Sequence, residues 1–181
     1  MRLAPGALSL DDLLVLHRGG QPLELDPAAW PAIDRSAAVV QAAAAGDAAV
    51  YGVNTGFGKL ASTRIGTEDL ATLQRNLIRS HSVGVGEPMA PAVVRLILAL
   101  KAASLARGHS GVRPEVVRAL LAAFNAGIVP FIPSQGSVGA SGDLAPLSHM
   151  TLALMGEGEC VVDGVRRPAA EVLRLAGLAP L

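Results

Sequence analysis

The segment from Pro91 to Arg107 constrains the fold more than any other, because apolar residues cover almost every side of it at helical spacing. Pro91 suits the first turn of a helix, where an amide hydrogen has no intrahelical partner. Arg95 interrupts the apolar run and Lys101 closes it, so the run is too short and too charged to cross a bilayer. A helix without a polar face must be covered by other elements. We therefore expect a central, buried helix here.

The amino-acid composition also favours packed helices. Hydrophobic residues make up 51% of the 181 positions and aromatic residues only 3%, so alanine, leucine and valine must fill the core. Alanine and leucine are among the strongest helix formers. Charged residues, at 17%, are scarce, which indicates that a large face is buried against other chains or further parts of the same chain. We expect one mainly α-helical domain over residues 1–181.

Capping and turn signals place the other elements. Ser9 and Asp12 have the spacing of a capping box, and Asp26 followed by Pro27 is typical of a second helix start. Asp163-Gly164 predicts a two-residue type I′ turn in a hairpin over residues 159–167. We expect helices at residues 10–18, 27–45, 67–81, 114–125, 144–155 and 168–176.

Two glycine-rich segments, residues 51–58 and 128–142, interrupt the helices. Their glycine density favours loops, where binding and catalytic residues gather. Tyr51 in the first loop suits either a mobile lid or an anchor at a strand end. The second loop ends in Ala140-Ser141-Gly142, which taken alone is a flexible turn before a helix. It has neither the Gly-Lys-Ser/Thr of a phosphate-binding loop nor the Gly-x-Ser-x-Gly of a serine hydrolase.

The charge and the cysteine count exclude several classes of protein. The chain has 15 lysine and arginine residues and 15 aspartate and glutamate residues, so its net charge is zero. The sequence contains no basic stripe of the kind that binds nucleic acid. The one cysteine, Cys160, excludes an internal disulfide, fits a reducing compartment and suits a small residue in a strand. No basic region followed by an apolar run opens the chain, so we expect a cytoplasmic protein without a membrane anchor. No histidine, cysteine or acidic cluster has metal-ligand spacing, so we expect no metal.

Residues 136–147 read Gly-Ser-Val-Gly-Ala-Ser-Gly-Asp-Leu-Ala-Pro-Leu. This string resembles the signature of the aromatic amino acid ammonia-lyases, in which the Ala-Ser-Gly triplet cyclises to the electrophile 4-methylideneimidazol-5-one. The resemblance implies that the Gly142 amide nitrogen attacks the Ala140 carbonyl, a fold-back that glycine permits, and that the Ser141 hydroxyl leaves as water. Gly139 would help to compress the turn. Asp143 would either assist the cyclisation electrostatically or cap the next helix.

Two further segments carry the same resemblance. Residues 51–58 resemble the N-terminal active-site loop of the family, in which Tyr51 would take part in acid–base work on the substrate. Ser80-His81 resembles the pair that selects the substrate, and Ser-His is the pattern of the histidine-specific members. A polar pair can hydrogen-bond an imidazole, and a site built for such bonds rejects substrates that lack them. Without the resemblance, His81 would be a histidine favoured by the dipole at a helix C-terminus.

The resemblance also implies a fold and an assembly. The fold would be the N-terminal lobe of the fumarase/aspartase-like fold with a small β-hairpin, in a homotetramer that deaminates L-histidine to trans-urocanate and ammonia. Family members are more than twice as long. Their active-site asparagine segment and the long helices of their central bundle are absent from residues 1–181, so the chain resembles the N-terminal portion of such an enzyme. Of the other histidines, His149 has a structural or supporting role, and His17 and His109 are surface or cap residues. Two alternatives stay open: a tyrosine or phenylalanine ammonia-lyase, and a non-catalytic folded module that only binds or associates.

Overall fold

Seven α-helices, three short 3₁₀ helices and three pairs of short strands make up the computed structural model over the residues that it describes, 1–139 and 144–181. The helices are α1 (Leu10–Arg18), α2 (Trp30–Ala45), α3 (Leu70–His81), α4 (Pro91–Leu105), α5 (Pro114–Asn125), α6 (Leu144–Leu154) and α7 (Ala169–Leu175). The strands are β1 (Arg2–Leu3), β2 (Glu24–Leu25), β3 (Val85–Pro88), β4 (Pro133–Gln135), β5 (Glu159–Val162) and β6 (Val165–Pro168). The mainly α fold class with a small hairpin is confirmed.

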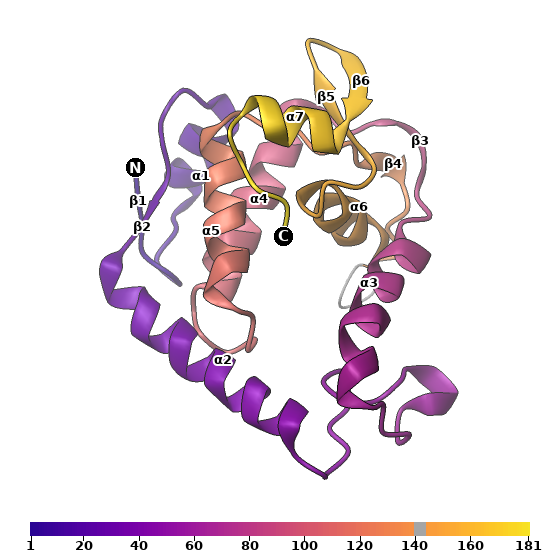
Figure 1. Cartoon of the computed structure of the whole chain (residues 1–181). Coiled ribbons are helices and arrows are strands. Elements are labelled where there is room, and N and C mark those ends of the chain that lie inside the picture. Colours follow the sequence, from indigo (N-terminus) through magenta and orange to yellow (C-terminus); the bar gives the residue numbers. More distant parts are fainter. Residues whose placement is uncertain (140–143) are drawn as a thin grey trace.

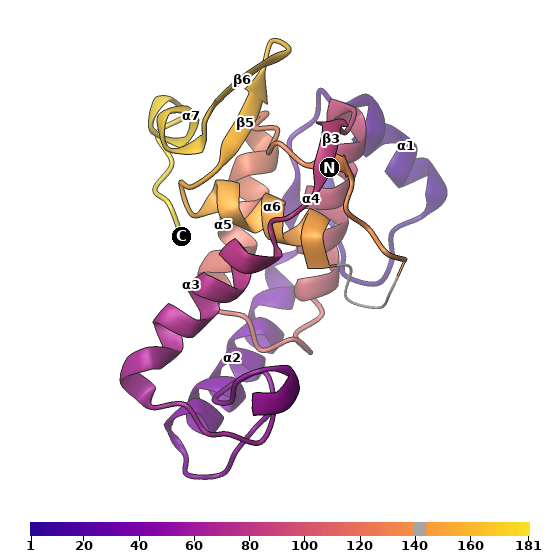
Figure 2. The ribbon, with the colours of Figure 1, turned by 90° about the vertical axis from the view of Figure 1, so that its right-hand side faces the viewer.

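Helix α4 lies at the centre, as expected from its apolar sequence, and packs on α1 and α5. Figures 1 and 2 show α4 and α5 side by side in the upper half of the molecule. Leu98 and Ala99 of α4 are fully buried. The expectation of burial on every side is too strong, because Val93 and Leu100 remain 41% and 43% exposed on another face of the helix. Within the described ranges, no helix combines the length and the apolar character that a membrane crossing requires.

The local signals in the sequence appear in the structure where they were expected. The Ser9 side chain accepts the Asp12 amide at the start of α1, and the Asp12 carboxylate accepts the Ser9 amide in return, which completes the capping box. Asp163 and Gly164 both have positive φ, at 50° and 76°, as a type I′ turn requires. That turn joins β5 to β6 in an antiparallel hairpin.

Cys160 lies fully buried in β5, as its assignment to a strand predicts. Burial raises the pKa of its thiol to about 11. Because the thiolate is the reactive form of cysteine, a thiol with this pKa is inert near neutral pH. Cys160 is therefore a packing residue in this fold.

One pair of strands lies where a loop was expected. β4 falls within residues 128–142 and pairs antiparallel with β3, with Val85 opposite Gln135 and Pro88 opposite Pro133. Prolines discourage a strand assignment because they lack an amide hydrogen, but they are tolerated where an edge needs no donor. The pairing matters for the site, because it joins the segment after α3 to the segment that leads into residues 140–143.

Helices α2 and α3 extend away from the core and are joined at the far end by residues 46–69 (Figures 1 and 2). The N-terminal end of α3 adjoins this connecting segment, and its C-terminal part packs against α6. An α-helix rises about 1.5 Å per residue, so the 12 residues of α3 separate its two ends by roughly 18 Å. The two ends of α3 therefore carry two different parts of the predicted site.

Candidate functional site

The C-terminal turn of α3 presents Ser80 and His81. The His81 Nδ1 lies 2.8 Å from the Leu77 carbonyl oxygen, and the Ser80 hydroxyl donates to the same oxygen at 3.0 Å. A carbonyl only accepts, so the His81 Nδ1 carries the hydrogen, and in the neutral ring Nε2 keeps its lone pair. That Nε2 has no partner among the described residues, so the pair offers a hydroxyl and an imidazole lone pair to a polar ligand.

The C-terminal end of α3 is fixed to α6 and the segment after it by two contacts. The Gly84 amide donates to Nε2 of His149 on α6 over 3.0 Å. Arg79 forms a two-bond ion pair with Glu157, just beyond α6, at 2.7 and 2.8 Å. Burial lowers the pKa of His149, which favours the neutral ring that the Gly84 contact needs.

The electrophile-forming triplet Ala140-Ser141-Gly142 and the adjacent Asp143 lie outside the described residues. Their flanks are described. Gly139 adopts a left-handed backbone with φ of 66°, which an L-residue rarely takes, and Leu144 is the first residue of α6. Since α6 packs on α3, the structure brings the Ser80-His81 end of α3 to the helix that follows the triplet.

Tyr51 lies apart from that group. It belongs to residues 46–69, at the opposite end of α3 from Ser80-His81 (Figure 1). Its side chain is 64% exposed, and its ring meets Phe57 edge-to-face with centroids 5.7 Å apart. Within one chain, the structure therefore does not bring Tyr51 together with the selectivity pair.

Asn54 is a residue of the first loop that sequence reasoning missed. Its side chain is fully buried, accepts the Val50 amide at 2.7 Å, and donates to the carbonyls of Ala43 and Ala48 at 3.1 and 3.0 Å. It thereby ties the loop that holds Tyr51 to the end of α2. The only sequence signal was a polar residue inside the glycine-rich string, which does not distinguish a buried anchor from a solvated turn residue.

The substitution Asn54→Ala is expected to destabilise the chain by about 1–3 kcal/mol, because it removes a fully buried amide and its three hydrogen bonds to partly buried backbone groups. Hydrogen exchange at residues 50–56 should accelerate more than in the core, since the loop loses its anchor. Asn76→Ala, at an exposed position of α3, is the matched control and should change stability little. Chemical denaturation of both variants measures the difference, and equal losses would contradict the anchoring role.

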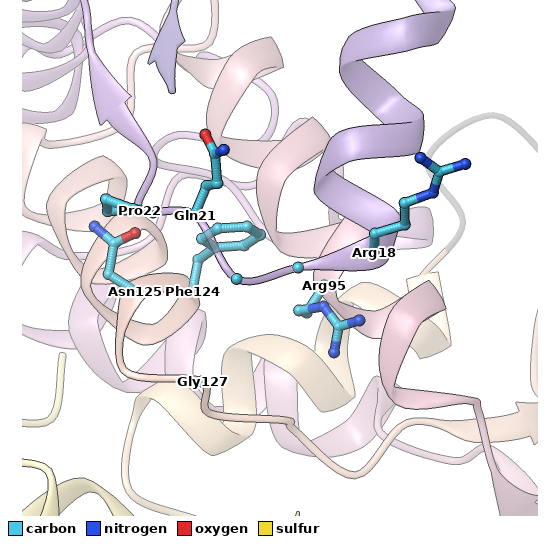
Figure 3. A pocket seen from close by; sticks show the side chains of 9 residues that line it. Arg18, Gln21, Pro22, Arg95, Phe124, Asn125 and Gly127 are labelled. Carbon is cyan, nitrogen blue, oxygen red and sulfur yellow. The ribbon is translucent and has the colours of Figure 1, made fainter.

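A cavity of about 430 Å³ lies elsewhere on the molecule, lined by residues 18–22, Arg95, Phe124, Asn125 and Gly127 (Figure 3). Figure 3 shows the Arg18 side chain directed away from Phe124. Arg95 already donates to the His17 carbonyl at 2.7 Å, and the Asn125 amide already pairs with the backbone of Leu23. None of the predicted site residues lines this cavity, so we do not assign it to the site.

Metal-ligating residues do not gather in the part of the chain that the structure describes, where no group of three histidine, cysteine or acidic side chains is placed to hold an ion. The described chemistry of the candidate site is therefore that of a hydroxyl and an imidazole at one end of α3 and a phenol at the other. Such groups bind polar ligands and move protons.

Comparison with known proteins gives a consistent result. The family model described as aromatic amino acid lyase matches residues 8–181. Over 179 residues, 99% of this chain, the sequence is 59% identical to the histidine ammonia-lyase of Rhodospirillum rubrum and 56% identical to that of Aromatoleum aromaticum. The alignments cover 35% and 34% of those relatives, so the chain spans about a third of their length.

A solved structure extends the similarity to three dimensions. The crystal structure of the histidine ammonia-lyase from Trypanosoma cruzi matches with a TM-score of 0.90 and 43% sequence identity. The alignment covers the whole of this chain and 36% of that chain. The fold of the described residues is therefore that of the corresponding part of the solved enzyme.

Proposed function

Since the chain belongs to the aromatic amino acid lyase family, we propose that it forms part of a histidine ammonia-lyase, which converts L-histidine to trans-urocanate and ammonia. The observation that carries the proposal is the polar pair Ser80-His81, held at the end of α3 against the helix that follows the Ala-Ser-Gly triplet. The names of the relatives at 56% and 59% identity support the same substrate.

We propose 4-methylideneimidazol-5-one, formed from Ala140-Ser141-Gly142, as the prosthetic group. The triplet supplies every atom of the ring. Gly139, directly before the triplet, has a left-handed backbone, which suits a chain that must reverse direction there. The group would supply an electron-poor methylidene carbon that takes up the substrate amine and makes the amino group a better leaving group. Asp143 would support its formation, either electrostatically or by capping α6.

Ser80 and His81 would bind the substrate side chain. The unpartnered Nε2 of His81 can accept the N–H of a substrate imidazole, and the Ser80 hydroxyl can donate to the other ring nitrogen when it turns from the Leu77 carbonyl to the substrate. A phenyl ring has neither a donor nor an acceptor, so it would leave both groups unpaired in a closed site. This reasoning favours histidine over phenylalanine.

Tyr51 would act as an acid or base on the substrate from a neighbouring copy of the chain. The support is geometric: its loop and Ser80-His81 lie at opposite ends of α3, whereas its 64% exposed side chain is open to another subunit. We propose a homotetramer, the assembly that the family resemblance implies, in which one subunit completes the site of the next. The proposed compartment is the cytoplasm, supported by a cysteine that is buried as a free thiol.

The substrate assignment is tested on a full-length protein that contains this chain, with a panel of L-histidine, L-tyrosine and L-phenylalanine, by following the absorbance of the alkene product. We expect turnover of histidine. His81→Leu should lower kcat/KM for histidine by about 10–100-fold, since a lost hydrogen bond to a polar ligand costs about 1.5–3 kcal/mol. His109→Leu, at an exposed histidine outside the site, is the control and should leave kcat/KM unchanged.

Each other outcome of the panel has a defined meaning. Turnover of tyrosine or phenylalanine in place of histidine would assign the chain to another branch of the family. No turnover of any substrate by a protein that carries the prosthetic group would favour a non-catalytic module that only binds or associates.

A further inference from the structure

The Gly84–His149 hydrogen bond joins two segments that the proposed reaction needs in a fixed relation. Gly84 follows the Ser80-His81 pair, and His149 lies in the second turn of α6, the helix that begins directly after residues 140–143. The Gly84 amide donates to the His149 Nε2 at 3.0 Å, so Nε2 must be unprotonated and the neutral ring must carry its hydrogen on Nδ1. Because α6 is a regular helix, the hydrogen bond to His149 fixes the position of Gly84 relative to the first residue of α6, Leu144.

The packing around Gly84 leaves little room for a side chain at this position. A Cβ placed on Gly84 would lie only 3.2 Å from His149 Nε2, 3.2 Å from Pro133 Cβ and 3.3 Å from the Gln135 carbonyl oxygen. A Cβ placed on Gly136 would lie 3.1 Å from the Gly84 Cα. The backbone at Gly84 is therefore enclosed by α6 and by the segment that enters the loop at residues 136–139.

The second connection between these segments is weaker. The Arg79–Glu157 pair is well aligned, but the two side chains are 48% and 32% exposed, and solvent screens such pairs. The His149 contact joins a backbone amide to a half-buried ring and fixes direction as well as distance. Of the two, it is the contact that can set the position of the chain after His81.

We propose that His149 is a positioning residue, which holds the end of α3 against α6 so that Ser80 and His81 keep the geometry that histidine binding requires. The proposal rests on the proposed function. A displacement of about 1 Å in a substrate-positioning group can reduce turnover about 100-fold. The hydrogen bond therefore matters to substrate binding without His149 touching the substrate.

Two variants distinguish the role of His149 as a hydrogen-bond acceptor from its role in filling space. His149→Gln keeps an acceptor oxygen near the position of Nε2, and His149→Leu keeps an apolar side chain of similar reach without an acceptor. We expect the leucine variant to raise KM for histidine at least tenfold while the protein still carries the prosthetic group. The glutamine variant should restore KM to within about threefold of the parent, which a purely space-filling role would not predict.

Nuclear magnetic resonance of the chain tests the contact independently of turnover. The parent should show a coupling across the hydrogen bond between the Gly84 nitrogen and the His149 Nε2, and slow exchange of the Gly84 amide. His149→Leu should accelerate that exchange and shift the ring resonances of His81. An absent coupling in the parent would overturn the proposal, and so would unchanged His81 resonances in a folded leucine variant or an unchanged KM in an active one. An inactive parent with the predicted resonances would contradict the proposed function alone.

Discussion

Substitution of Ser141 by alanine is expected to abolish both the prosthetic group and lyase turnover. In the proposed cyclisation, the Ser141 hydroxyl leaves as water and its Cβ becomes the methylidene carbon. Alanine has no oxygen to lose, so no electron-poor double bond forms. Enzymes commonly accelerate reactions about 10⁶-fold or more, and removal of the group that activates the amine should bring urocanate formation to the detection limit.

Ser134→Ala is the matched control for this experiment. Ser134 is an exposed serine in β4, a few residues earlier in the same segment of chain. This substitution should leave the absorbance of the prosthetic group and the rate of turnover unchanged. The mass should fall only by the one oxygen atom that the substitution removes. If the Ser141→Ala variant turned over histidine at the parent rate, the proposed role of Ser141 in forming the prosthetic group would be wrong.

The second large effect is expected in the core, where Leu98→Ala should destabilise the chain by about 3–5 kcal/mol. Leu98 is fully buried in the middle of α4, so truncation removes buried apolar surface and leaves a cavity that the neighbouring helices cannot close completely. Domains are typically stable by only about 5–15 kcal/mol, so this one substitution removes a large part of the total.

Leu100→Ala in the same helix is the control for the core substitution. Its side chain is 43% exposed, so the same change of residue should cost about 1 kcal/mol or less. Urea denaturation of the two variants gives the comparison, with the midpoints and slopes reported together. Similar losses in both variants would contradict the assignment of α4 as the buried centre of the fold.

The sequence predicted those features whose cause lies within a few residues. The Ser9–Asp12 capping box and the Asp163-Gly164 turn are local, and the structure has both in place. The pairing of β3 with β4 was missed, because Val85 and Gln135 lie far apart in the chain and the prolines nearby argue against strands. Pairings of this kind depend on which elements pack together, which no short window of sequence contains.

The site shows the same division. Motifs identified Ser80, His81 and Tyr51, but only the structure shows that the loop of Tyr51 lies at the far end of α3 from the other two. The burial of Asn54 and the Gly84–His149 hydrogen bond also arise from tertiary contact. The roles of Ser80, His81, Tyr51 and Gly139 remain predictions, to be decided by the variants described above.

The intact mass of the purified chain tests the central claim most directly, because the prosthetic group is made from the polypeptide itself. The account predicts a mass lower by two water molecules than the value calculated from the 181 residues, with the difference confined to the proteolytic fragment that contains Ala140-Ser141-Gly142. A mass equal to the calculated value, in this fragment and in the whole chain, would contradict it.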